Sequence, residues 1–223
     1  MTDFAAARAN MVDTQVRTEG VTDHAVIGAM ADIPRESFLM NRLQPFAYSD
    51  DDIVVKEATG TMPARYLIRP APLARLAQAA EVSESDFALL VGCATGYMAA
   101  VLARLAGSVV AVEEDEQLAS ESSETLLELG IDNVAIVTGP LEAGYPSEGP
   151  YDVIILGGAV ETVPEALFDQ LREGGRLVAV LGYSRAGQAM VYTRTDDDIG
   201  RRVVFDAHIP PLPGFRKPQS FIF

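Results

Sequence analysis

Cysteine and histidine are almost missing from this 223-residue sequence, which holds one cysteine, Cys93, and two histidines, His24 and His208. One cysteine excludes a disulfide framework, and these three residues together cannot supply a Cys/His zinc cluster. The same scarcity leaves few candidate bases for a Ser-His or Cys-His nucleophile. We therefore expect no metal site and little room for nucleophilic catalysis.

Long apolar runs are missing as well. The longest uncharged apolar stretch, residues 87–103, is interrupted by Gly92 and Gly96 and ends before Arg104, so it is too short to span a bilayer. The first 13 residues carry three charges and lack the apolar centre of a secretory signal. These features predict a cytoplasmic protein that does not enter a membrane.

Positive charge is absent from the middle of the chain. Between Leu105 and Leu171 there is no Lys or Arg, although this stretch holds 14 of the 32 acidic residues and the net charge is −15. An acidic block of this kind repels phosphate backbones, so we expect no binding to nucleic acid. It is either a solvated helical face that keeps the protein in solution or a field that favours a cationic small molecule or basic partner.

Apolar and helical segments alternate from residue 86 onward. Strands are predicted at residues 87–91, 109–113, 134–138, 151–156 and 176–181. Helices are predicted at residues 97–106, 115–129 and 164–171. This alternation favours an α/β fold with a parallel sheet covered on both faces. Two further apolar segments, 188–195 and 201–205, flank the turn sequence DDDIG and predict an antiparallel hairpin.

The region before residue 86 is different in character. We expect helices at residues 3–18 and 22–32, the second capped by Thr22, and a third helix after Pro70. Residues 34–65 contain three consecutive acids and several turn-forming residues, which indicates irregular structure.

A glycine turn, GCATG, follows the first predicted strand and leads into a helix. Glu113 ends the second strand 21 positions after Gly92, where an acid can accept hydrogen bonds from ribose hydroxyls. The pattern predicts a ligand that contains a nucleoside. Alternatively, the turn is only a tight connection and Glu113 an ordinary acid at a strand end.

The middle position of this turn narrows the choice of nucleoside ligand. A dinucleotide fingerprint needs a glycine where Ala94 stands, which makes a nicotinamide-dependent oxidoreductase the weakest of the hypotheses. S-adenosylmethionine contains ribose and adenine without phosphate and carries a net positive charge. It therefore tolerates a looser turn and suits an acidic half of the chain.

Four segments resemble the protein-L-isoaspartate O-methyltransferases, in the same order and at similar spacing. They are MVDTQVRTEGVTDHAVIGAMADIPRESF (11–38), VGCATGYMAAVLARLAGSVVAVE (91–113), GPYDVII (149–155) and LREGGRLVAVLG (171–182). The resemblance implies a Rossmann-like, seven-stranded methyltransferase fold, with a mostly parallel sheet, a C-terminal antiparallel hairpin and an N-terminal helical cap. It further implies a protein-repair enzyme that transfers a methyl group from S-adenosylmethionine to the α-carboxyl of isoaspartyl residues in damaged protein.

The resemblance also assigns site residues, within a single expected domain. Since the sequence has no repeats and no low-complexity linker, we expect one domain, with a cap and substrate-loop region at 1–80, a core at 81–182, and a hairpin and tail at 183–223. The cofactor-binding residues would be Gly92, Cys93, Ala94, Gly96, Tyr97, Glu113 and Leu141. Arg65, Ile68 and Arg69 would bind the substrate, unless both arginines are solvated charges that balance the acids at 50–52.

Several positions depart from the family pattern. Leu90 replaces an acid before the glycine turn, Ala94 replaces its middle glycine, and Ile68 replaces a hydroxyl-bearing residue of the substrate loop. The family's Gly-Asp-Gly reads Gly139-Pro140-Leu141, and its Thr-Ala-Ala reads Gly157-Gly158-Ala159. An alternative is therefore a non-catalytic relative that acts by binding a partner.

Carboxyl methylation itself needs no general base, because the acceptor carboxylate is ionised at neutral pH. For this reason no catalytic residue is assigned.

Overall fold

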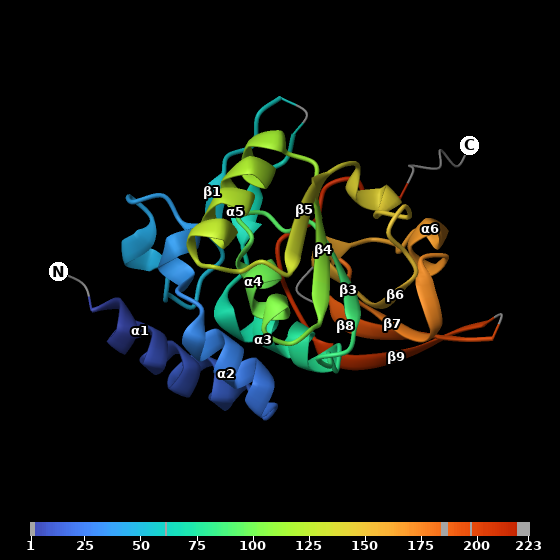
Figure 1. Cartoon of the computed structure of the whole chain (residues 1–223), viewed down its shortest axis with the longest axis horizontal. Helices are drawn as coiled ribbons and strands as arrows, with labels where there is room; N and C mark the ends of the chain where they lie inside the picture. The colour runs from blue at the N-terminus through green and yellow to red at the C-terminus, as the bar shows by residue number, and fades with distance from the viewer. Residues whose placement is uncertain (1–2, 61, 184–186, 197, 218–223) are drawn as a thin grey trace.

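The chain folds around a seven-stranded sheet with the spatial order β5-β4-β3-β6-β7-β8-β9 (Figure 1). The computed structural model describes residues 3–60, 62–183, 187–196 and 198–217. The strands are β3 Phe87–Val91, β4 Ser108–Glu113, β5 Val134–Thr138, β6 Tyr151–Val160, β7 Leu171–Leu181, β8 Gln188–Thr195 and β9 Asp198–Asp206. The first five strands in the order pair in parallel, and β8 and β9 pair antiparallel to their neighbours. The mostly parallel sheet with a C-terminal antiparallel hairpin is confirmed.

Helices cover both faces of this sheet. The helices are α1 Phe4–Met11, α2 His24–Asp32, α3 Pro70–Ala79, α4 Tyr97–Ala103, α5 Glu116–Glu128 and α6 Glu165–Phe168. Buried residues of α2, α3, α4 and α5 belong to one apolar cluster, whereas α6 packs into a second cluster on the opposite face. Figure 1 shows the N-terminal helices on the side of the sheet that α3 and α4 cover. No helix in the described part of the chain has the length and apolarity needed to cross a bilayer.

The N-terminal cap is more broken than expected. The single helix expected at 3–18 is α1 followed by a π-helical turn, Val12–Val16, and a 3-10 turn, Arg17–Glu19. Helix α2 is capped by Asp23, whose carboxylate accepts from the Ala25 and Val26 N–H groups. Asp23 therefore takes the cap position expected for Thr22, whose backbone N–H donates to the side chain of Gln78.

A two-stranded antiparallel sheet begins inside segment 34–65, which was expected to be irregular, and its second strand starts at the last residue of that segment. It consists of β1 Ile53–Lys56 and β2 Arg65–Leu67, with Lys56 and Arg65 as register partners. Strands of three and four residues are too short to leave a clear period-2 pattern. Strands β6 and β7 are longer than expected, so the Gly174-Gly175 turn lies inside β7, and α6 is shorter than the predicted helix.

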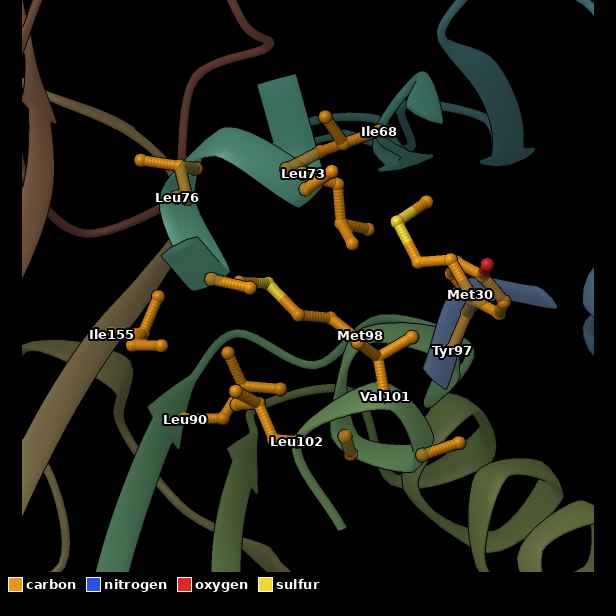
Figure 2. Close-up of a cluster of buried hydrophobic side chains, with 14 of the residues drawn as sticks. Met30, Ile68, Leu73, Leu76, Leu90, Tyr97, Met98, Val101, Leu102 and Ile155 are labelled. Atoms are coloured by element: carbon orange, nitrogen blue, oxygen red, sulfur yellow. The ribbon is translucent and has the colours of Figure 1, made fainter. Parts of the chain in front are cut away.

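Apolar side chains surround Leu90 of β3, beneath the glycine turn (Figure 2). Leu90 of β3 points toward Met98 and Leu102 of α4, and Ile155 of β6 and Leu76 of α3 both lie on the other side of Leu90 from Tyr97. These side chains are all buried. An ionised carboxylate at position 90 would be desolvated here without a charged partner, which explains locally why leucine suits this position.

Candidate functional site

The glycine turn connects β3 to α4 at the carboxyl ends of the parallel strands. Gly92, Ala94 and Gly96 all have positive φ values, of 83°, 50° and 90°. The Gly92 N–H donates to the Val112 carbonyl at 2.8 Å, which ties the turn to the end of β4. Ser122 of α5 donates its hydroxyl to the Ala94 carbonyl at 2.9 Å. In open α/β sheets this edge is where ligands bind.

Glu113 ends β4 beside this turn, and its side chain is completely buried. Its two oxygens each accept one hydrogen bond of 2.8 Å from the Arg65 guanidinium. The Ala94 N–H donates to Oε2 at 2.8 Å, and the N–H groups of Glu114 and Asp115 donate to Oε1 at 3.1 and 3.3 Å. Burial raises the pKa of Glu113, while Arg65 and the backbone donors oppose that shift. The carboxylate is therefore held entirely by the chain itself.

Arg65 reaches Glu113 from the first position of β2. Its side chain is only 6% exposed, so the pair is shielded from water on both sides. Lys56, its register partner on β1, forms an ion pair with Asp115, two residues after Glu113. The small β1–β2 sheet is thus attached to the end of β4 by two ion pairs.

Leu212 covers the glycine turn from the other side. The backbone around it pairs with the end of β6, since the Leu212 N–H donates to the Ala159 carbonyl and the Ala159 N–H donates to the Pro210 carbonyl, both at 2.8 Å. A β-carbon built on Gly92 would lie 2.3 Å from Leu212 Cδ1. Beside Gly92 and Ala94 lies a cavity of about 20 Å³, whose lining residues include Ile68 and Met98. Thr95 of the turn borders a separate cavity of about 260 Å³, which is also lined by Phe38 and Leu118.

A larger cavity of about 450 Å³ also borders Leu212. It is lined by residues 58, 60, 62 and 63 of the β1–β2 connection, by Tyr183, and by residues 211–214 and 216. Arg216 supplies a cation at this wall.

The remaining candidate residues are distributed around the turn. Cys93 is buried, and burial together with the nearby Glu113 charge raises the pKa of its thiol. Tyr97 is buried with its ring against Phe38, on the side of the N-terminal helices (Figure 2). Leu141 is buried in the cluster on the opposite face of the sheet. The structure therefore brings Cys93, Ala94 and Glu113 together with Arg65, whereas Tyr97 and Leu141 point into the core on opposite sides. Their role in cofactor binding stays a prediction.

The expected substrate residues also have internal contacts. The Ile68 carbonyl accepts from Arg35 Nη2 at 2.6 Å. Arg69 forms a 3.0 Å ion pair with Asp52 and donates to the His208 carbonyl at 2.8 Å. Their role toward a substrate likewise stays a prediction. Within the described ranges, no group of three or more His, Cys, Asp or Glu side chains is arranged to hold a metal ion.

Two residues of the site were missed by sequence reasoning. Arg35 is fully buried, and its guanidinium donates to the carbonyls of Ala47 and Ile68 and lies over the Tyr97 ring. Leu212 lies in a tail with no periodic pattern, so no signal in the sequence could have placed it on Gly92. Arg35 does fall in the first segment that carries the family resemblance.

Comparisons with known proteins agree with this architecture. The model of the family described as protein-L-isoaspartate(D-aspartate) O-methyltransferase (PCMT) matches residues 7–208. A protein-L-isoaspartate O-methyltransferase of Koribacter versatilis (strain Ellin345) is 36% identical over 214 residues, which cover 96% of this chain and 94% of the relative.

Solved structures give the same result. A protein-L-isoaspartate O-methyltransferase has a TM-score of 0.80 and 27% identity, over 93% of this chain and 66% of that one. A putative protein-L-isoaspartate O-methyltransferase from Plasmodium falciparum, in complex with S-adenosyl-L-homocysteine, has a TM-score of 0.75 at 20% identity, over 95% of this chain and 99% of that one, and shows the fold alone. On the family match and the curated relative, this chain belongs to the protein-L-isoaspartate O-methyltransferase family.

Proposed function

We propose that this chain transfers the methyl group of S-adenosylmethionine to the α-carboxyl of isoaspartyl residues in damaged cytoplasmic proteins. The observation that carries the proposal is the family match over residues 7–208, which includes the glycine turn, Glu113 and the β1–β2 sheet. Family membership favours this enzyme over a non-catalytic binding module. The acidic middle of the chain supports a peptide substrate over a nucleic acid, because it repels phosphate.

The chemistry of the acceptor suits the residues that are present. An isoaspartyl carboxyl is ionised at neutral pH and attacks without a general base, so the scarcity of histidine is no obstacle. Such an acceptor needs positioning and exclusion of water. The 450 Å³ cavity at the strand ends supports an extended peptide as the occupant, because its walls are largely apolar and Arg216 can meet a carboxylate.

The conformation described here does not fit the cofactor. The cavity beside Gly92 and Ala94, which faces Glu113 and Arg65, has a volume of about 20 Å³, whereas pockets for small molecules measure roughly 300–1,000 Å³. The carboxylate expected to hold the ribose is already bound by Arg65 and by three backbone N–H groups. We therefore derive no step of the reaction from this conformation.

The proposal is tested by methyl incorporation. The purified chain is incubated with methyl-labelled S-adenosylmethionine and a peptide with one isoaspartyl residue, beside the same peptide with ordinary aspartate. We expect label only in the isoaspartyl peptide, and loss of the label as methanol under mild base, because the product is a methyl ester. Incorporation that is equal in both peptides, or absent from both, contradicts the proposed substrate.

A further inference from the structure

We propose that Arg65 competes with the cofactor for Glu113, so that the cofactor binds only after Arg65 and Leu212 have left the glycine turn. This inference rests on the proposed function, because it takes S-adenosylmethionine as the ligand of that turn. It makes Arg65 a residue that sets cofactor affinity, in addition to any role it has toward the substrate. The strands β1 and β2 then act as a closure over the cofactor site.

The first argument is the number of hydrogen bonds that Glu113 can accept. A carboxylate offers about four lone-pair sites on its two oxygens. Five N–H donors already approach these oxygens, two of them from the Arg65 guanidinium. A ribose diol needs the same two oxygens. Because the three backbone donors belong to the glycine turn and to the end of β4, the guanidinium is the donor that the ribose must replace.

The second argument is space. Leu212 Cδ1 lies only 2.3 Å from the position of a β-carbon built on Gly92, so a ligand cannot approach the bare backbone of this glycine. The Arg65 Nη2 atom lies 3.4 Å from the same point. One apolar and one cationic side chain therefore fill the hollow that the glycine creates. Both must move before an atom of the cofactor can reach Gly92.

The third argument concerns which part of the protein can move. Strand β4 is paired with β3 and β5 along its length and is fixed in the large sheet. Strands β1 and β2 pair only with each other among the described strands, and an isolated pair of short strands is marginally stable. Lys56 and Arg65 are register partners that bind Asp115 and Glu113, so both ion pairs break when this small sheet lifts.

The energetic consequence is a lowered apparent affinity. A protein whose binding-competent state is a minor population binds its ligand more weakly by that fraction. A bidentate ion pair between buried groups favours the closed state, since removal of one partner leaves the other desolvated. Loss of the guanidinium should therefore raise the affinity for the cofactor, although Arg65 lies inside the site.

The test is a calorimetric titration with S-adenosylhomocysteine, which binds without reacting. The variants are Arg65→Gln, Arg65→Lys, and Arg65→Gln combined with Glu113→Gln. The matched control is Arg172→Gln, which removes an exposed arginine from an ion pair with Asp152 at the far ends of the strands. We expect R65Q to bind about tenfold more tightly than the wild-type chain. R65K should lie between the two, and R172Q should bind like the wild type. The gain should vanish in the double variant, which lacks the contested carboxylate.

Equal or weaker binding by R65Q than by the wild type overturns the inference. Methyl transfer by the same proteins separates this result from the proposed function. If the wild type binds and methylates while R65Q gains no affinity, only the competition fails. If R65Q gains affinity but no variant methylates the isoaspartyl peptide, the competition stands and the substrate is wrong.

Hydrogen exchange on the wild-type chain gives a readout that does not depend on the folding of any variant. Saturating S-adenosylhomocysteine should increase exchange in residues 53–56 and 65–67 and decrease it in residues 91–97. A merely structural ion pair would predict unchanged or slower exchange in both segments. That second pattern would overturn the inference even if every variant failed to fold.

Discussion

Arg35 and Ile68 are joined by a buried hydrogen bond, in which Nη2 of the arginine donates to the backbone carbonyl at 2.6 Å. The same guanidinium donates through Nε to the Ala47 carbonyl at 2.7 Å and lies 4.8 Å above the Tyr97 ring. One fully buried side chain thus fixes the predicted substrate loop to the segment before β1 and to the start of α4.

Arg35→Lys should destabilise the protein strongly. A lysine ammonium cannot reproduce the planar geometry that satisfies both carbonyls, and an unsatisfied buried acceptor costs about 1–3 kcal/mol. We expect a loss of about 2 kcal/mol in the free energy of unfolding, measured with urea. The control is Arg42→Lys at an exposed position of the same region. Equal stability of the two variants would show that the buried contacts of Arg35 contribute nothing.

Leu212→Ala should make the protein less stable and a better ligand binder. Removal of a buried leucine side chain costs about 2–5 kcal/mol, and here it also opens the space above Gly92. The control is Leu177→Ala, which creates a cavity inside the same apolar cluster but away from the turn. Calorimetry should show tighter binding of S-adenosylhomocysteine by L212A only. If both variants gained the same affinity, the effect would come from destabilisation of the core in general and not from the space above Gly92.

Ala94→Gly should be tolerated without loss of stability. Ala94 has φ +50°, a left-handed conformation that costs an L-residue about 1–2 kcal/mol. Relief of this strain offsets two costs of the substitution, which are the loss of a buried methyl group and the greater conformational entropy of the unfolded chain. We expect urea unfolding within about 0.5 kcal/mol of the wild type. Ala100→Gly, in the buried middle of α4, should lose about 1–2 kcal/mol. Similar losses for both variants would contradict the strain at Ala94.

Cys93 should resist thiol reagents in the folded protein. Its side chain is buried, and both burial and the Glu113 charge raise the pKa of the thiol, so little thiolate is available at pH 8. Since the sequence has one cysteine, the absorbance of a disulfide reagent reports this position alone. We expect labelling at least about a hundredfold slower than in urea. Labelling as fast as in the unfolded chain would mean that the turn is open in solution.

Asp86 should make stability depend on pH in the acidic range. Burial alone would raise its pKa, but the Ser83 N–H and the Arg176 guanidinium hold the pKa below its usual value. Because the pKa of Asp86 is lower in the folded than in the unfolded protein, the ionised carboxylate stabilises the fold at pH values above the unfolded pKa of about 3.9. This stabilisation disappears as the pH falls through the folded pKa.

Asp86→Asn should therefore cost about 1–2 kcal/mol at pH 7 and progressively less below pH 4, as measured by urea unfolding at each pH. Asp132→Asn, at an exposed position, is the control. A penalty for D86N that stays constant down to pH 3 would place the effect in packing and not in the charge.

The order of the main elements could be predicted from the sequence, because each strand of the parallel sheet is a continuous apolar run. Residues 87–91 and 134–138 were predicted with their observed bounds. The short strands β1 and β2 could not be predicted, since they are held by contacts distant in sequence, such as the Lys56–Asp115 ion pair. The division of the first helix likewise depends on packing and not on local propensity.

The candidate site could be located from the sequence but not described. The spacing from Gly92 to Glu113 places both at one edge of the sheet, as the parallel register of β3 and β4 requires. The sequence does not say that Arg65 rather than a ligand contacts that carboxylate, because 48 positions separate the two residues. The contact depends on the route of the intervening chain, which no local pattern encodes.

Gly157 and Gly158, two of the positions that depart from the family pattern, pack directly against Gly92 and Leu212. A β-carbon on Gly157 would lie 2.3 Å from the Gly92 carbonyl oxygen, and one on Gly158 would lie 3.0 Å from Leu212 Cβ. Restoring a larger residue at either position would force the neighbouring backbone or the C-terminal tail aside. Replacing these glycines by the family's residues therefore requires changes at several positions together. A single replacement at 157 or 158 should give a less stable protein than this chain.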